Sequence, residues 1–201
     1  MTTTVVEEEK SVALSTASAA PLGLAGFGVT TIVFSAISAG LAPPEAMTVV
    51  IPLAFAYGGL GQIITGILEF RNGNTFGTAA YTSFGLFWWW YALLQWTTGA
   101  GWMAAPAPEG IGIALLTWGL LAFGLWVATF RTSVVVWSIF LLLWVTFFLL
   151  GAASFGAGTG TIGAWVGLVL GLEALYLSVA QIVQAMYGRD ILPLGGPILR
   201  T

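Results

Sequence analysis

The chain has no cysteine and no histidine among its 201 residues. Disulfides, thiolate nucleophiles, imidazole metal ligands and histidine proton shuttles are therefore excluded. Because most hydrolytic and redox enzymes rely on one of these groups, the sequence predicts a protein that is not an enzyme and that carries no cofactor or metal.

Charged residues are scarce as well, at 6% of the chain against about 25% in an ordinary soluble domain. Hydrophobic residues make up 58%, so polar side chains cannot cover a water-soluble globule. The formal net charge of −3 leaves no basic patch, which excludes nucleic acid as a partner. The 27 glycines and 10 tryptophans are typical of membrane helices. The composition predicts an all-α protein of the lipid bilayer.

Six apolar stretches are long enough to cross a hydrocarbon core, which takes about 20 residues of helix. They run from Leu22 to Leu41, Met47 to Leu68, Thr75 to Trp96, Ile111 to Phe130, Ser133 to Phe155 and Ile162 to Met186. They predict a six-helix transmembrane domain over residues 21–188. A disordered cytoplasmic tail over residues 1–20, without the features of a signal peptide, precedes it, and a cytoplasmic C-terminal tail over 189–201 follows.

The basic residues test this topology, because they collect on the cytoplasmic side of short loops. With the N-terminus inside, six spans put every Lys and Arg on the cytoplasmic side: Lys10, Arg71, Arg131, Arg189 and Arg200. Glu45 and Glu109 fall outside. The chain is thus predicted to be a multi-pass cell-membrane protein with both termini in the cytoplasm.

Polar side chains within the spans are candidates for a substrate pathway, since an unsatisfied polar group in hydrocarbon is costly. The candidates are Thr30, Thr31, Tyr57, Gln62, Thr82, Tyr176 and Gln181. For any single one of them, hydrogen bonding between helices is the ordinary interpretation. As a set, neutral hydroxyls and amides suit a small polar or weakly anionic solute.

Glu173 is the ionisable residue deep in a predicted span, which makes it a candidate for a proton-linked site or a gate. The alternative is a hydrogen-bonded carboxyl that only ties helices together. Glu69 and Arg71, near the end of the second span, are interpreted as an interfacial ion pair.

Two further patterns predict packing rather than chemistry. Gly163, Gly167 and Gly171 form a small-xxx-small stripe that allows another helix to approach closely. The run from Trp88 to Trp90 is interpreted as part of an aromatic belt, with a stacking platform for a ligand as the alternative. Three adjacent side chains point in three directions around a helix, so they cannot all line one pore.

Three segments carry a family resemblance: APLGLAGFGVTT from Ala20 to Thr31, YGGLGQIITGILEFRNGNTFGTAAYTSFGLFW from Tyr57 to Trp88, and YGRDILPLG from Tyr187 to Gly195. In order and spacing they resemble the acetate uptake transporter family, which includes bacterial acetate and succinate permeases and fungal acetate and ammonia-export proteins. The family signature corresponds here to Ala20, Pro21, Leu22, Gly23 and Leu24.

The resemblance implies a homohexamer in which each six-helix protomer has its own pathway. It also implies a narrow hydrophobic constriction, whose residues correspond to Phe27, Phe84 and Leu143, with Leu141 and Leu142 as alternatives for the last position.

The chain departs from the family pattern at two places. Ser18, Ala19 and Ala20 stand where bacterial relatives have Asn-Pro-Ala, and Phe84 stands where a tyrosine is usual. Both departures bear on substrate preference and gating.

The resemblance implies membrane transport of acetate and similar small monocarboxylates, with succinate as a further candidate and with protons moving together with the acid in a symport. The alternatives are a passive selective channel of the same fold and permeation of ammonium or amides. A hypothesis of a different functional class is a structural or signalling membrane protein that transports nothing.

Overall fold

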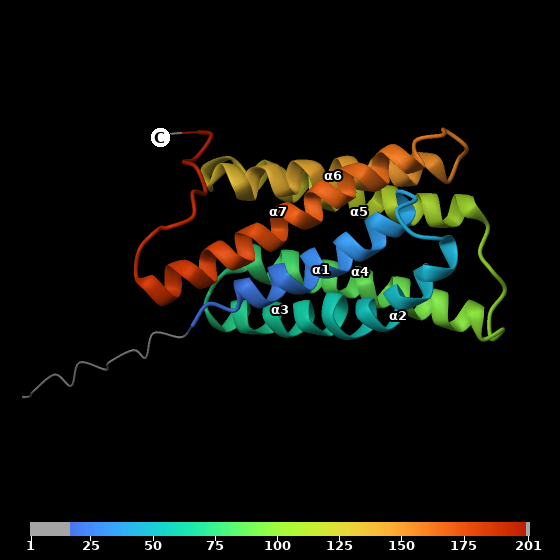
Figure 1. The fold of residues 1–201 in the computed structure, drawn as a ribbon, viewed down its shortest axis with the longest axis horizontal. Coiled ribbons are helices and arrows are strands. Elements are labelled where there is room, and N and C mark those ends of the chain that lie inside the picture. The colour runs from blue at the N-terminus through green and yellow to red at the C-terminus, as the bar shows by residue number, and fades with distance from the viewer. Residues whose placement is uncertain (1–16, 200–201) are drawn as a thin grey trace, which may run out of the picture.

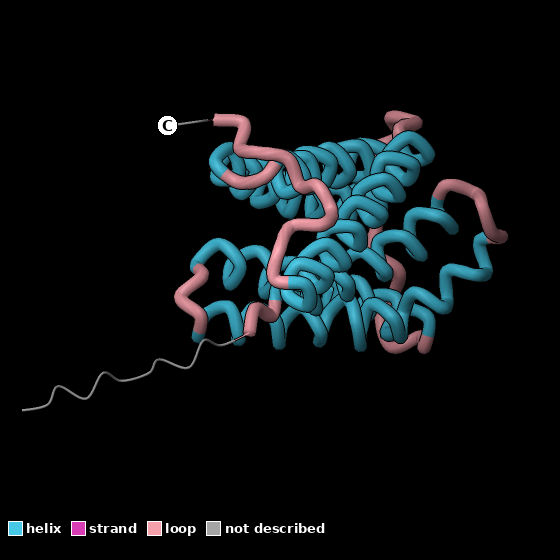
Figure 2. Tube along the Cα trace, turned by 60° about the vertical axis from the view of Figure 1, so that its left-hand side comes forward, coloured by secondary structure: helices cyan, strands magenta, loops and turns pink. Residues whose placement is uncertain are grey.

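The computed structural model describes residues 17–199, so Lys10, Arg200 and most of the predicted N-terminal tail lie outside the described residues. The described part is built from helices joined by short loops (Figures 1 and 2). The elements are α1 (Ala20–Ser38), η1 (Pro44–Val49), α2 (Val50–Leu53), η2 (Ala54–Gly61), α3 (Gln62–Arg71), α4 (Thr75–Gly99), α5 (Pro108–Ala128), η3 (Thr129–Arg131), α6 (Val134–Ala153) and α7 (Gly160–Tyr187). The predicted all-α class is confirmed.

Among residues 17–199, five helical stretches are long and apolar enough to cross a membrane: α1, the run Pro44–Arg71, the run Pro108–Arg131, α6 and α7. With 25 residues, α4 falls within the 19 to 28 residues of these stretches. Its tryptophans, tyrosines and threonines lower its mean hydropathy, because these side chains are amphipathic. All helical stretches begin and end within three residues of the predicted spans. The six-span topology stays a prediction.

Close contact between α1 and α7 forms the centre of the bundle. A Cβ atom on Gly171 of α7 would lie 2.9 Å from the backbone nitrogen of Ile32 and 3.1 Å from the carbonyl oxygen of Gly28. Side chains of any size are thus excluded where the two helices cross. The close packing predicted from the glycine stripe is therefore present.

The second helical stretch is irregular, because a 3-10 helix, a short α-helix and the π-helix η2 precede α3. π-Helices widen the turn and release backbone groups for other partners. Here the indole nitrogen of Trp89 donates to the carbonyl oxygen of Phe55 at 2.8 Å, and the two rings stack 5.0 Å apart. This contact joins η2 to α4.

The segment after α7 folds back on the bundle. The backbone nitrogen of Val135 donates to the carbonyl oxygen of Leu194 at 3.2 Å, and that of Leu199 donates to Phe130 at 2.9 Å. The Tyr176 hydroxyl donates to the carbonyl oxygen of Pro193 at 2.8 Å. Residues 188–199 therefore cover the beginning of α6.

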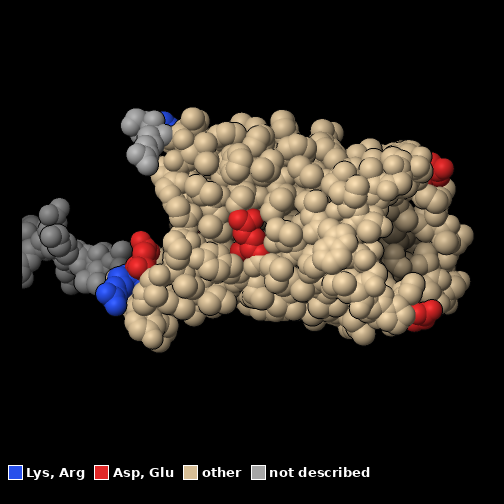
Figure 3. All heavy atoms as spheres, turned by 45° about the horizontal axis from the view of Figure 1, so that its top comes forward, with Lys and Arg blue, Asp and Glu red and all other residues tan. Residues whose placement is uncertain are grey.

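Most of the charged atoms in view lie at the two ends of the bundle, while one acidic group lies in the middle of the long face (Figure 3). Arg71 ends α3, Arg131 ends η3 and Arg189 follows α7, so all three lie at the end where α1 begins. We call this the arginine end. Glu45 and Glu109 lie in the first turns of η1 and α5, at the opposite end.

Candidate functional site

A cavity of about 430 Å³ occupies the arginine-end half of the bundle, and we call it the first cavity. Its lining is mostly apolar. The polar members come from three helices and two helix ends: Gln62, Asn74, Tyr81, Thr132 and Gln181. Such a lining, with a few polar groups on apolar walls, is typical of a site for a small solute.

A second cavity of about 210 Å³ lies toward the opposite end. Its polar lining residues are Thr31, Ser35, Trp88, Trp90, Tyr91, Gln95 and Thr146. The molecular surface is hollowed at this end of the bundle (Figure 3). None of the charged residues within 17–199 lines either cavity, so the described linings offer neutral groups to a solute.

The two cavities approach each other at three residues that we call the neck: Phe27, Phe84 and Leu143. Phe27 and Leu143 line both cavities, while Phe84 lines the first. The Phe27 and Phe84 ring centroids are 6.4 Å apart. All three side chains are at most 8% exposed. The structure therefore brings together, from α1, α4 and α6, the three residues that the resemblance implied for a constriction. Leu141 and Leu142 line neither cavity.

Three of the seven pathway candidates line a cavity: Gln62 and Gln181 the first, and Thr31 the second. Thr30 lines neither, because its hydroxyl donates to Gly26 within α1 at 2.8 Å and its side chain packs on Gly58. The remaining three also lie away from both linings. Thr82 contacts Gly66 between α3 and α4, Tyr57 packs near Gly26, and Tyr176 bonds to the C-terminal segment.

Several cavity residues carry buried polar atoms that have no partner among the described residues. They are Oε1 of Gln181 in the first cavity, and the hydroxyl oxygens of Thr31 and Thr146 with the indole nitrogen of Trp88 in the second. Buried polar groups in proteins nearly always find a partner, which is often water. These atoms therefore favour polar contents in the two cavities.

The signature at the start of α1 forms part of the first cavity. Ala20 and Leu24 line it, while Leu22 is exposed on the outside of the bundle. The carbonyl oxygen of Pro21 accepts a 2.7 Å hydrogen bond from Ser178 of α7. A Cβ on Gly23 would lie 2.6 Å from the ring of Tyr81, so only glycine fits this contact.

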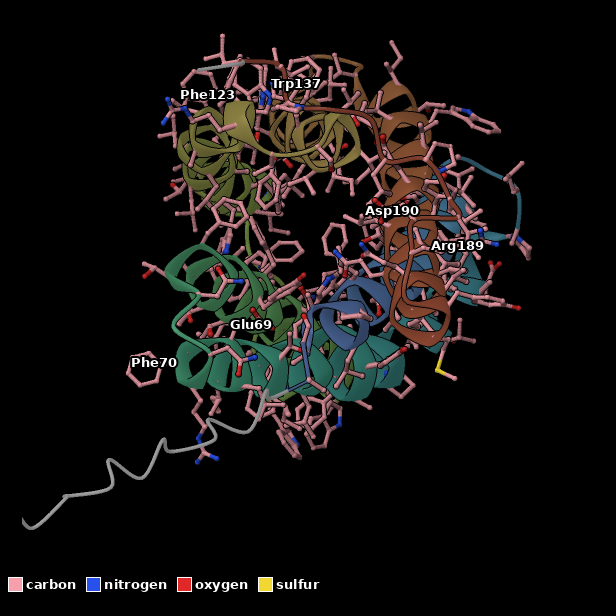
Figure 4. The ribbon with its side chains drawn as sticks, turned by 90° about the vertical axis from the view of Figure 1, so that its left-hand side faces the viewer. Glu69, Phe70, Phe123, Trp137, Arg189 and Asp190 are labelled. Atoms are coloured by element: carbon pink, nitrogen blue, oxygen red, sulfur yellow. The ribbon has the colours of Figure 1, made fainter. Side chains whose placement is uncertain are left out.

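Glu69 is buried at the arginine end, with 3% of its surface exposed. Its carboxylate accepts hydrogen bonds from the Asn74 amide at 2.6 Å and from the backbone nitrogen of Ala19 at 3.1 Å. Figure 4 shows Glu69 inside the bundle and Phe70 pointing away from it. The expected ion pair with Arg71 is not formed, because the carboxylate turns inward and Arg71 stays exposed.

Glu173 lines neither cavity. One carboxyl oxygen forms a hydrogen bond with Ser138 of α6, and the other is buried without a partner among residues 17–199. The structure therefore places this residue at a helix contact, outside the neck and its cavities.

Sequence reasoning missed several polar residues of the cavity linings, among them Ser35, Asn74, Gln95, Thr132 and Thr146. Thr146 is an isolated hydroxyl in a very apolar span, which is a signal that the search for intramembrane polar groups could have used. The tryptophans do point in different directions, as predicted, since Trp89 lines neither cavity. Trp88 and Trp90 nevertheless belong to the second cavity rather than to an outer belt alone.

The sequence is similar to those of known membrane transport proteins. The succinate-acetate/proton symporter SatP of Escherichia coli is 33% identical over 181 residues, which are 89% of this chain and 95% of the relative. Acetate permease A of Emericella nidulans is 35% identical over 134 residues, or 62% of this chain and 45% of the fungal protein.

A solved structure shares the fold. The bacterial acetate channel SatP superimposes with a TM-score of 0.86 and 32% sequence identity, covering 90% of this chain and 99% of that one. The model of the GPR1/FUN34/yaaH family matches residues 3–188. A match of that length, in a chain that shares both the helix arrangement and the signature at the start of α1, makes this protein a member of the GPR1/FUN34/yaaH family.

Proposed function

We propose that this chain is a membrane transport protein that moves acetate and similar small monocarboxylates through a pathway inside each protomer. The observation that carries the proposal is the neck, because Phe27 and Leu143 line both cavities. A solute crossing between the cavities must pass these side chains. The names of the relatives, which describe an acetate channel, an acetate permease and a succinate-acetate symporter, support the substrate class.

An apolar neck between neutral cavities favours a neutral acid over a hydrated anion. Stripping water from a carboxylate is expensive unless fixed dipoles or charges replace it. The neck consists of two phenyl rings and one leucine. Phe84 stands where the family usually has a tyrosine, so the neck has no hydroxyl. We infer that the acid crosses the neck together with a proton.

Six spanning helices, with both termini in the cytoplasm, are part of this proposal. With its 25 residues, α4 reaches about 37 Å at 1.5 Å per residue, longer than a hydrocarbon core of about 30 Å. Counting α4 as a span puts Arg71, Arg131 and Arg189 on one side of the membrane, which is then the cytoplasmic side. We also propose a homohexamer, as the resemblance implies.

The test is acetate uptake into liposomes that contain the purified protein. Protein-free liposomes supply the background from acetic acid that diffuses through lipid. We expect protein-dependent uptake that Phe27→Trp, which fills the neck, abolishes. The matched control is Phe70→Trp, on a side chain that is 72% exposed. Equal uptake by the Phe27→Trp variant and the unaltered protein would overturn the pathway.

A passive channel is the second candidate, favoured by the same neck, because no charged residue lines either cavity. The two candidates differ in coupling. In a symporter a pH gradient drives acetate above its equilibrium distribution, whereas a channel only speeds its approach to equilibrium.

A further inference from the structure

The second cavity has two unlike walls, and the polar one lies where α1, α6 and α7 meet. A Cβ atom on Gly167 of α7 would lie 2.6 Å from the hydroxyl oxygen of Ser35 and 3.3 Å from the Cγ2 methyl of Thr146. The side chains of Ser35 and Thr146 therefore meet at this glycine. Thr31 lies one helical turn before Ser35, on the same face of α1. All three line the second cavity, and we call them the hydroxyl wall: Thr31, Ser35 and Thr146.

The other wall is built from aromatic rings, most of them on α4. Phe34, Trp88 and Tyr91 pack edge to face, with ring centroids 5.5 to 6.0 Å apart. Phe87 contacts the rings of Trp88 and Phe147, with centroids 5.2 and 5.0 Å away. These five rings line the same cavity, and we call them the aromatic wall. Such a wall favours a flat aromatic ligand, because rings attract one another edge to face or in offset stacks.

Three lining side chains end in buried polar atoms that have no partner among residues 17–199: the indole nitrogen of Trp88 and the hydroxyl oxygens of Thr31 and Thr146. These side chains are only 3%, 5% and 8% exposed. An indole nitrogen can only donate, so a ligand that satisfies it must carry an acceptor. A carboxyl group suits all three atoms, since its oxygens accept from the N–H and from both hydroxyls. An ammonium ion has no lone pair and would leave the Trp88 N–H unpaired.

The volume of the second cavity suits one aromatic ring that carries a carboxyl group. An apolar cavity of about 150 Å³ in a protein holds a benzene molecule. The second cavity measures about 210 Å³, which leaves roughly the volume of two water molecules beside such a ring. A carboxyl group fits into this remainder, whereas acetate alone would leave much of the cavity unfilled.

We propose that the second cavity is a binding site for an aromatic monocarboxylate such as benzoate. The ring lies against the aromatic wall, and the carboxyl group accepts hydrogen bonds from Trp88 and from the hydroxyl wall. The site adjoins the neck, because Phe27 and Leu143 line it too. A ligand held there blocks entry to the neck, and this consequence, unlike the binding itself, rests on the proposed transport function.

Calorimetric titration of the detergent-solubilised protein with benzoate tests the site without any transport. We expect one benzoate per chain and no binding of benzylamine, whose protonated amine has no acceptor. Trp88→Phe keeps a ring and removes the N–H, while Thr146→Val keeps the shape and removes the hydroxyl. Each should weaken benzoate binding about tenfold, as the loss of a hydrogen bond to a charged group does. The matched control is Trp102→Phe, on a side chain that is 70% exposed.

The aromatic wall is tested separately with Phe34→Ala. Loss of one ring contact should weaken benzoate binding about fivefold. The matched control is Phe123→Ala on α5, an exposed residue that lines neither cavity. The melting temperature of each variant without ligand shows whether it is folded. Equal benzoate affinity in Trp88→Phe, Thr146→Val and the Trp102→Phe control would overturn the site, as would benzylamine binding as tightly as benzoate.

Acetate uptake into liposomes separates this proposal from the transport function. Protein-dependent uptake without benzoate binding would overturn the site and leave transport standing. Benzoate binding by a protein that takes up no acetate would leave the site standing and overturn the function. Where both hold, benzoate should inhibit uptake, and the Trp88→Phe variant should need about tenfold more of it. Uptake unaffected by saturating benzoate would overturn the blockage of the neck.

Discussion

The carboxylate of Glu69 accepts a 2.6 Å hydrogen bond from the side-chain amide of Asn74, which joins the end of α3 to the start of α4. The oxygen of the same Asn74 amide accepts from the backbone nitrogen of Gly77 and caps α4. The other carboxylate oxygen accepts a hydrogen bond from the backbone nitrogen of Ala19, just before α1. One buried acid therefore fixes three helices around the first cavity.

The first prediction concerns this acid. Glu69→Ala leaves the Asn74 amide and the Ala19 nitrogen without their acceptor, and we expect a loss of about 2 kcal/mol in unfolding free energy. Thermal unfolding in detergent measures it. Glu45→Ala, an exposed acid at the other end, is the control and should change the melting temperature little.

Ala19→Pro tests one bond of this cluster separately. Proline stands at this position in the bacterial relatives that the signature resembles, and it has no N–H to donate. We expect a loss of about 1 kcal/mol in unfolding free energy, smaller than that of Glu69→Ala. The loss should vanish when Ala19→Pro is made in the Glu69→Ala background; additive losses would show that the bond contributes nothing.

The second prediction concerns the neck. Phe27→Ala or Leu143→Ala widens it, so discrimination between acetate and lactate should fall about tenfold, within the 1 to 3 kcal/mol that a pocket exerts against an extra group. Competition by lactate against labelled acetate in liposomes measures this. The control for Leu143 is Leu120→Ala, on a residue that is 64% exposed. An unchanged lactate to acetate ratio in both neck variants would contradict the constriction.

The bounds of the helices could be predicted because the hydrophobicity of a segment depends on its own residues and not on its neighbours in the fold. The helix ends lie within three residues of the predicted spans, since loops with proline, glycine and charge mark where apolar helices stop. The interior of the Pro44–Arg71 run could not be predicted. Its π-helix carries the Phe55 carbonyl that accepts from Trp89, a contact between residues distant in sequence.

The candidate site was predictable in its apolar part and less so in its polar part. The resemblance supplied Phe27, Phe84 and Leu143 directly. By contrast, a hydroxyl in a span either bonds to its own helix or lines a cavity, and the sequence does not distinguish the two. Thr30 bonds to its own helix, whereas Thr31, one residue on, lines the second cavity. The orientation of Glu69 depended on Asn74 and Ala19, which only the folded chain brings to it.

The third prediction concerns the crossing of α1 and α7. Gly171→Val places carbon atoms against the backbone of Ile32 and Gly28, and overpacking of this kind costs about 1 to 3 kcal/mol. We expect a lower melting temperature and a reduced yield of folded protein in membranes. The matched control is Gly124→Val on α5, where a Cβ has open space. Equal melting temperatures in the two variants would argue against the tight crossing.

The fourth prediction concerns the second cavity. Thr31→Val and Thr146→Val keep the shape of each side chain and remove its unpartnered hydroxyl. If these hydroxyls bond to the permeating acid, each change weakens binding by about 1 kcal/mol, or about fivefold. The half-saturating acetate concentration should rise accordingly. Thr117→Val, on an exposed hydroxyl of α5, is the control.

The last prediction is that uptake through the protein becomes faster as the outside pH falls. A simple carboxylic acid titrates near pH 4 to 5, so above that range its neutral fraction falls about tenfold for each pH unit. An apolar neck that admits the neutral acid should respond to this fraction. The measurement is the initial rate of labelled acetate uptake from pH 5 to pH 8, after subtraction of the rate in protein-free liposomes. The Phe27→Ala variant provides the internal comparison, because a wider neck admits water with the anion and should flatten the pH dependence. A rate through the unaltered protein that follows total acetate and ignores pH would mean that the anion itself crosses between Phe27, Phe84 and Leu143.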